Sequence, residues 1–270
     1  MLGNAATNIA FPVTTISTAA ALLLGIGGAS NYNLEMGAGR ERKASEIAGS
    51  ALSTLVIIGT AIAAAILIFL KPLLNFFGAT DTVMPYAIDY VGIIAIGLPF
   101  FTLSVGGNHL IRADRSPTYS MMCTLTGAII NIILDPLMIF GIGPFPEMGI
   151  RGAALATVIG QIFGMALGLW GVFRHQKVLN VNMREFKWRG QTIKDIYRVG
   201  LPGIVMQSVV SVMTAGMNGI LIAFSQTAVN VLGVYFKLQT FVFMPVFGLN
   251  QGALPVMGYN YGARNRKRLM

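Results

Sequence analysis

The sequence has 270 residues, of which 54% are hydrophobic and only 11% are charged, and its formal net charge is +9. Soluble domains carry about 25% charged residues, so this composition predicts an all-α polytopic membrane protein. A single cysteine, Cys123, excludes an internal disulfide, and two histidines are too few for a conventional zinc site.

Seven apolar stretches are long enough to cross a bilayer core of about 30 Å. The first five are expected at residues 5–29, 47–70, 83–110, 117–143 and 152–173. Residues 199–236 contain no charge and are too long for one crossing, so a turn at 225–227 is predicted to divide the remainder. The sixth and seventh spans then cover residues 199–224 and 229–257.

Basic residues occupy alternate loops between these spans. The loops near Arg40, Arg112, Arg184 and Arg264 hold 16 of the 19 lysines and arginines. Loops rich in Lys and Arg remain in the cytoplasm, so these four loops are predicted to be cytoplasmic in a protein of the cell (inner) membrane. The positive charge is therefore attributed to membrane orientation, and no nucleic-acid partner is expected.

The fourth span contains two polar residues, Asn131 and Asp135, directly before Pro136. Residues four apart lie on one face of a helix. A carboxylate at membrane depth costs roughly 3 kcal/mol or more and usually handles an ion, a proton or a polar substrate. Proline removes one backbone hydrogen bond and frees a carbonyl nearby. The alternative is that Asp135 lies close enough to the interface to remain hydrated.

Lys237 is the second charge inside a predicted span, and Gln239, Asn250 and Gln251 follow it on the same helix. One interpretation is a polar site in the C-terminal part of the chain. The other is that Lys237 extends toward the external interface. Charges at the cytoplasmic ends of spans are expected to be solvated, as for Arg112 and Asp114, or to form surface ion pairs, as for Glu35.

An internal repeat relates the ends of the first and seventh spans. The first copy consists of Gly-Gly-Ala at 27–29 and Gly-Ala at 37–38, followed by a basic cluster. The second copy, about 225 residues later, consists of Gln-Gly-Ala at 251–253 and Gly-Ala at 262–263, again followed by a basic cluster. Duplicated halves are common in secondary transporters. By symmetry the first half should have six spans, one more than the five found before the basic linker. The chain is therefore expected to be a fragment of a protein with about twelve membrane spans.

The chain resembles the multidrug and toxic compound extrusion (MATE) family. The motifs that carry the resemblance are Asn-Ile-Ile-Leu-Asp-Pro at 131–136, the Gly-rich segment at 149–157, Leu-Pro-Gly at 201–203 and Gly-Tyr-Asn-Tyr-Gly-Ala-Arg at 258–264. Their order and spacing match the family from its second to its eighth helix. The resemblance implies a parent with two pseudo-symmetric six-helix lobes, truncated here to about seven transmembrane helices.

The resemblance also implies a function and its residues. Residues 1–173 would form the N-terminal lobe without its first helix, 174–198 a cytoplasmic amphipathic linker, and 199–270 the first two helices of the C-terminal lobe. Family members exchange Na⁺ or H⁺ for small, amphipathic, often cationic organic compounds. Asn131 and Asp135 match the family's cation site, and Thr157 is the nearest match to a threonine that joins it. No cofactor and no metal beyond Na⁺ is expected, and the full-length protein is expected to act as a monomer.

Two other interpretations remain open at this point. A flippase for lipid-linked saccharides would have a related architecture, but its cavity should contain several Arg or Lys. The chain could instead be a non-transporting fragment or an assembly partner of another chain. An intramembrane enzyme is not expected, because the sequence has no nucleophile and base pair, metal cluster or phosphate loop.

Overall fold

The computed structural model describes residues 2–114, 116–174, 190–222 and 226–269, and this part of the chain consists of helices joined by short turns. The helices are α1 (Leu2–Gly37), α2 (Glu41–Ile68), α3 (Leu70–Phe76), α4 (Met84–Ala113), α5 (Pro117–Phe140), α6 (Ile150–Arg174), α7 (Gly190–Ile222), α8 (Gln226–Gly262) and α9 (Arg266–Leu269).

The predicted membrane spans correspond to long helices. Among the described residues, six helices are long and apolar enough to cross a membrane: α1, α2, α4, α5, α6 and α8. Residues 199–222 of the predicted sixth span lie in α7, several of whose side chains are outside the described part of the chain, as are residues 223 and 224. The protein is thus an all-α, multi-pass membrane protein. The prediction missed the short helix α3, and it ended the first span eight residues before α1 ends at Gly37.

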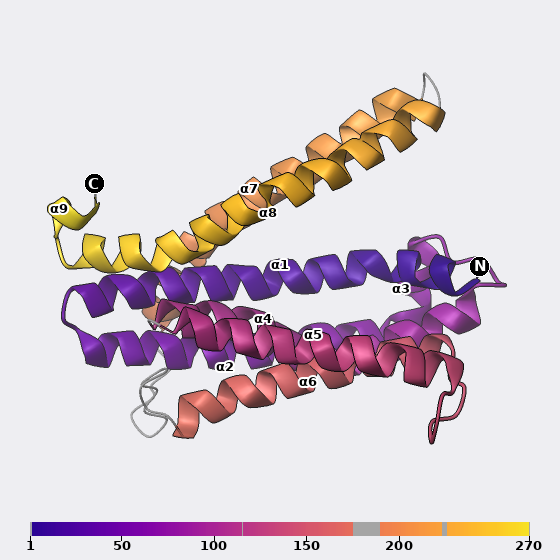
Figure 1. Ribbon diagram of the computed structural model, residues 1–270, viewed down its shortest axis with the longest axis horizontal. Coiled ribbons are helices and arrows are strands. Elements are labelled where there is room, and N and C mark those ends of the chain that lie inside the picture. The colour runs from indigo at the N-terminus through magenta and orange to yellow at the C-terminus, as the bar shows by residue number, and fades with distance from the viewer. Residues whose placement is uncertain (1, 115, 175–189, 223–225, 270) are drawn as a thin grey trace.

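Helices α1 to α6 form a bundle in which α4 is central. Helix α4 packs against α1, α2, α5 and α6, as Figure 1 shows. Two apolar cores fill this bundle, one near the α1–α2 turn around Leu24, Leu55 and Leu110, and the other toward the opposite end around Val91 and Leu98.

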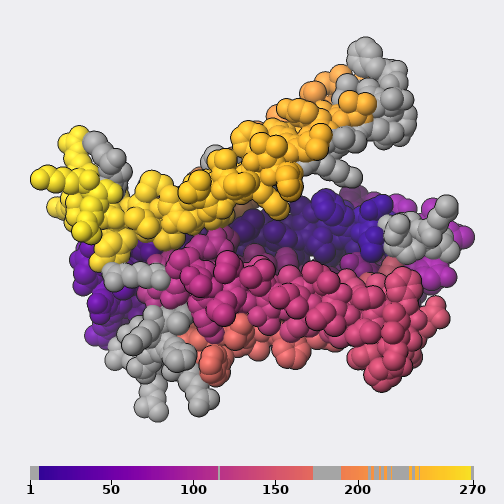
Figure 2. Space-filling view, in the orientation of Figure 1, coloured from indigo at the N-terminus to yellow at the C-terminus, as the bar shows by residue number. Residues whose placement is uncertain are grey.

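Helices α7 and α8 form a hairpin that contacts the bundle mainly through α1. The contact involves the first part of α7 and the last part of α8, whereas the rest of the hairpin diverges from α1 (Figures 1 and 2). In the most apolar stretch of α8, within Leu238–Gly262, none of the residues is buried.

Glycines allow α1 to approach both helices of the hairpin. A Cβ atom added at Gly27 would overlap the carbonyl oxygen of Ile196 in α7, and one added at Gly37 would overlap the carbonyl oxygen of Tyr259 in α8. The second contact is reciprocal, because a Cβ at Gly262 would overlap the carbonyl oxygen of Leu34. Gly37 and Gly262 are 225 positions apart, and so are Leu34 and Tyr259.

The predicted internal repeat is visible in the backbone at these two helix ends. Gly39 has a φ of 73°, and Arg264, 225 residues later, has a φ of 53°. The turn after α1 contains a hydrogen bond from the Arg40 N–H to the Glu35 carbonyl, and the turn after α8 contains the equivalent bond from Asn265 to Asn260. The contact between α1 and α8 is therefore a pseudo-two-fold contact between repeated segments.

The basic loops lie at one end of the molecule. The α1–α2 turn, the α4–α5 turn, the C-terminal end of α6 and the α8–α9 turn are all at the left in Figure 1. The predicted loop near Arg184 falls outside the described residues. Residues 190–198 of the predicted linker belong to the same continuous helix as the following span.

Candidate polar site between α5 and α6

A close approach of two helix backbones creates the candidate site. A Cβ atom added at Gly160 of α6 would lie 2.6 Å from the carbonyl oxygen of Gly127 in α5. A Cβ atom added at Gly127 would lie 2.8 Å from the carbonyl oxygen of Gly160. Any larger residue at either position would push the helices apart. Because Asn131 is one turn beyond Gly127, and Thr157 is one turn before Gly160, this contact brings their side chains together.

Asn131, Asp135 and Thr157 form a hydrogen-bonded cluster. The amide Nδ2 of Asn131 donates to Oδ1 of Asp135 at 3.2 Å and lies 3.5 Å from Oγ1 of Thr157. The Thr157 hydroxyl donates to the Ala153 carbonyl at 2.9 Å. All three side chains are half-buried, and Pro136 lies within α5 directly after the carboxylate. The structure thus brings together the three residues predicted for the cation site.

The cluster offers three kinds of oxygen ligand for a hard cation: a carboxylate, an amide oxygen and a hydroxyl. In the structure the Asn131 amide presents its nitrogen to Asp135. A cation at this position would require the amide to present its oxygen instead, which is a rotation about the last side-chain bond. A proton on Asp135 would leave the observed arrangement in place, since the second carboxylate oxygen can carry it.

Asn131 and Thr157 also line an open cavity between α4, α5 and α6, with a volume of about 880 Å³ including the solvent at its mouth. The cavity continues along α4 toward the cytoplasmic end, where His109 and Arg112 line it. Sequence analysis had assigned no role to Asn108 and Gln161, which also line this cavity, because a single polar residue in an apolar helix gives no signal of its neighbours.

Two contacts at the cytoplasmic end differ from the prediction of solvated charges. Arg112 of α4 donates a hydrogen bond to Oε1 of Gln251 in α8 at 3.1 Å. The hydroxyl of Tyr32 in α1 donates to the carboxylate of Asp114. Arg112 and Asp114 lie where helices converge, so each has a protein partner. Glu35 does form the predicted ion pair, with Arg40 and with Lys43.

The residues predicted as a polar site in the C-terminal part are not gathered in one place. Gln251 bonds Arg112, whereas Gln239 and Asn250 are exposed. Eleven residues of one helix separate Gln239 from Asn250, which is about 16 Å along the axis. The side chain of Lys237 lies outside the described part of the structure.

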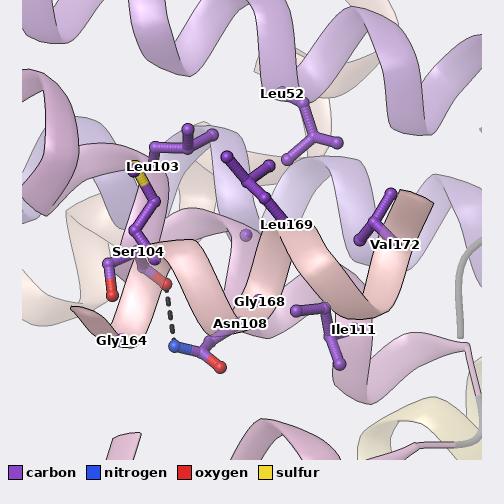
Figure 3. Close-up of a pocket in the computed structure, with 11 residues that line it drawn as sticks. Leu52, Leu103, Ser104, Asn108, Ile111, Gly164, Gly168, Leu169 and Val172 are labelled. Carbon is purple, nitrogen blue, oxygen red and sulfur yellow. Dashed lines mark hydrogen bonds between the residues drawn. The ribbon is translucent and has the colours of Figure 1, made fainter. Parts of the chain in front are cut away.

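A second, smaller cavity lies between α2, α4 and α6 (Figure 3). Its volume is only about 20 Å³, room for about one water molecule, and most of its lining is apolar, including Leu52, Leu103 and Leu169. The amide of Asn108 donates to the Ser104 carbonyl at 2.8 Å, the bond drawn in Figure 3. With its polar groups already satisfied, this space is best described as a packing gap inside the bundle.

Known proteins confirm the family that the motifs suggested. The family model MatE matches residues 4–137 and 202–270, and the chain belongs to this family. The chain is similar to a "FAD transporter" of Shewanella oneidensis, with 29% identity over 98% of the chain, and to "Multidrug export protein MepA" of Staphylococcus haemolyticus, with 26% identity over 98%. It spans 58% and 57% of the length of these two relatives.

Solved structures are similar over the whole chain. A crystal structure of "MATE in the straight conformation" superposes with a TM-score of 0.92 at 26% identity, and the match covers 100% of this chain and 60% of the other. An outward-facing MATE family transporter gives a TM-score of 0.88 at 27% identity, covering 98% and 58%. These relatives are named as transporters or export proteins and not as enzymes.

Proposed function

We propose that the full-length protein is a cation-coupled secondary transporter that exports small, amphipathic organic compounds. Membership in the MatE family and the names of the relatives support the transporter class. The observation that carries the coupling proposal is the Asn131–Asp135–Thr157 cluster on the facing helices α5 and α6.

In this proposal the cluster binds the coupling Na⁺ or H⁺. Asp135 supplies the negative charge, Asn131 turns its amide oxygen toward the ion, and Thr157 contributes its hydroxyl oxygen. Residues 1–173 form most of one lobe and residues 199–270 the start of the other, with 174–198 between them. The cation and the substrate each bind more tightly to one arrangement of the two lobes. Because both act on the same conformational equilibrium, transport of the cation is coupled to transport of the substrate.

The test is efflux of ethidium from cells that express the full-length gene. We expect Asp135→Asn to abolish efflux while the protein still reaches the membrane in normal amounts. Asp89→Asn is the matched control, because Asp89 lies at the external end and pairs with Arg151, so this variant should transport normally. Undiminished efflux by Asp135→Asn would place the coupling residue elsewhere.

A second candidate substrate class, anionic compounds, is favoured by two observations. Among the described residues that line the 880 Å³ cavity, the charged one is Arg112, beside His109, and the FAD transporter relative handles a substrate with two phosphates. If FAD is transported and ethidium is not, and Arg112→Gln reduces the FAD flux, the substrate is anionic. A flippase is less well supported, because its cavity should contain several basic residues.

A further inference from the structure

The two repeated helix ends have the same backbone but different charges. At the end of α1, Glu35 accepts hydrogen bonds from Arg40 and Lys43, the latter at 2.9 Å. At the end of α8, Asn260 occupies the position equivalent to Glu35, and its amide donates to the Val256 carbonyl at 2.8 Å. The α8 end therefore carries basic residues without the carboxylate that neutralises the α1 end.

Four basic residues follow Asn260 within eight positions: Arg264, Arg266, Lys267 and Arg268. All four side chains are exposed. In the part of the chain that the structure describes, none of them forms an ion pair with a carboxylate. This is a concentration of uncompensated positive charge at the end of a membrane span.

An open pocket lies between the two helix ends, with a volume of about 1190 Å³ including the solvent at its mouth. Arg40 lines it from the α1 side, and Arg264 and Arg266 line it from the α8 side. Glu35 also lines the pocket, but its side chain is only 12% exposed and already binds two cations. The Glu35 carboxylate raises the pKa of Arg40, which keeps the guanidinium charged. The pocket thus has an excess of positive charge.

The position of the pocket identifies the kind of anion. It lies where the apolar helices α1 and α8 end, on the side that carries the basic loops, which is the depth of the lipid headgroups. Tyr261 lines it and is 69% exposed, as is typical of aromatic residues at a membrane interface. Arginine guanidinium groups bind phosphate in a bidentate geometry, and basic clusters next to a span attract anionic lipids.

We propose that this pocket binds the phosphate of an anionic phospholipid headgroup in the cytoplasmic leaflet. The headgroup is held by Arg264 and Arg266 from the hairpin and by Arg40 from the bundle. Because these residues belong to the two parts that meet at Gly37 and Gly262, the bound lipid stabilises their contact. The inference depends on the membrane orientation and not on which substrate is transported.

The test compares two double variants of equal charge in the full-length protein, reconstituted in nanodiscs of phosphatidylcholine with or without phosphatidylglycerol. Arg264→Gln with Arg266→Gln removes the two pocket arginines of the hairpin and leaves Arg40 in place. Lys267→Gln with Arg268→Gln removes two neighbouring charges that do not line the pocket. The readouts are the thermal unfolding midpoint and the phosphatidylglycerol retained through purification, measured by mass spectrometry.

We expect phosphatidylglycerol to raise the midpoint of the wild type and of the Lys267/Arg268 variant, but not of the Arg264/Arg266 variant, which should also lose the retained lipid. Equal loss in both double variants would overturn the proposal in favour of diffuse attraction, and no loss in either would overturn it as well. Stabilisation of the wild type by inorganic phosphate alone would assign the pocket to a soluble anion. If the glutamine variant is unstable in phosphatidylcholine, Arg264→Lys with Arg266→Lys preserves the charge and should weaken lipid retention through the lost bidentate geometry.

Discussion

The α1–α6 bundle and the α7–α8 hairpin are both built from long apolar helices, yet they bury their side chains to different extents. In the most apolar stretches of α1, α4 and α6, 39% of the residues are buried, compared with 11% in that of α5 and none in that of α8. The bundle is therefore packed around α4, with α5 and its polar residues at the less buried side, whereas the hairpin presents its apolar faces to lipid or to other helices. The two parts meet at close glycine contacts, two of which, at Gly37 and Gly262, lie at the cytoplasmic ends of α1 and α8.

The largest effect is expected from a substitution that blocks the contact between α1 and α8 at Gly37 and Gly262, because this contact joins the hairpin to the bundle. Gly37→Leu places a side chain against the Tyr259 carbonyl, and overpacking of this kind costs about 1–3 kcal/mol. A disulfide between Asn33→Cys and Gly258→Cys reports the contact, since a Cβ at Gly258 would lie 3.1 Å from the Cβ of Asn33.

We expect efficient cross-linking in a Cys123→Ala background and about a tenfold lower yield after Gly37→Leu, if the cost is near 1.4 kcal/mol. The control is Gly248→Leu, also on an interface helix but with open space around its Cβ position. Unchanged cross-linking in the Gly37 variant would contradict the pseudo-symmetric contact.

Gly160→Ala tests the close packing of α5 against α6. Its methyl group would meet the Gly127 carbonyl at 2.6 Å, so α5 and α6 must separate at a cost of about 1–3 kcal/mol, and the Asn131–Thr157 contact is lost. Thermal unfolding in detergent should show a lower midpoint and transport should fall. Gly168→Ala on the same helix has its nearest neighbour at 3.4 Å and should behave like the wild type. Similar midpoints for both variants would mean that α5 and α6 are not tightly packed.

Arg112→Gln should weaken the join between bundle and hairpin to a smaller degree. It removes the hydrogen bond to Gln251, which we expect to contribute about 1 kcal/mol because Arg112 is half-exposed. A double-mutant cycle with Gln251→Leu, in which the yield of the cross-link between positions 33 and 258 is measured, gives the coupling free energy of the Arg112–Gln251 hydrogen bond. Strictly additive effects of the two substitutions would indicate that the bond is absent in the membrane.

The smallest effect is expected for an ion pair inside the bundle. Arg151 of α6 and Asp89 of α4 lie 2.9 Å apart at the external end, and the Arg151 side chain is 59% exposed. Such an exposed pair contributes little to stability, because apolar packing already joins the two helices. Asp89→Asn should leave the unfolding midpoint almost unchanged, and a large drop would show that the bundle depends on this pair.

Apolar runs in the sequence predicted the helices well, because membrane depth requires unbroken apolar segments. The pairing of Asn131 with Asp135 followed from helical spacing, and the repeat at Gly37 and Gly262 followed from matching letters. Sequence could not predict contacts made by packing between distant helices, such as those of Arg112 with Gln251 and of Tyr32 with Asp114. For a charged group at a helix end, the sequence gives the position on its own helix but not the partner that another helix brings to it.

The central claim is that Asp135 and Asn131 bind the coupling cation. The most direct measurement is calorimetric titration of the purified full-length protein with Na⁺ at constant pH, with proton release followed in the same sample. We predict that the wild type binds Na⁺ or exchanges a proton, and that Asp135→Asn does neither while keeping the wild-type unfolding midpoint. An Asp135→Asn protein that binds Na⁺ and exchanges protons like the wild type would contradict the assignment.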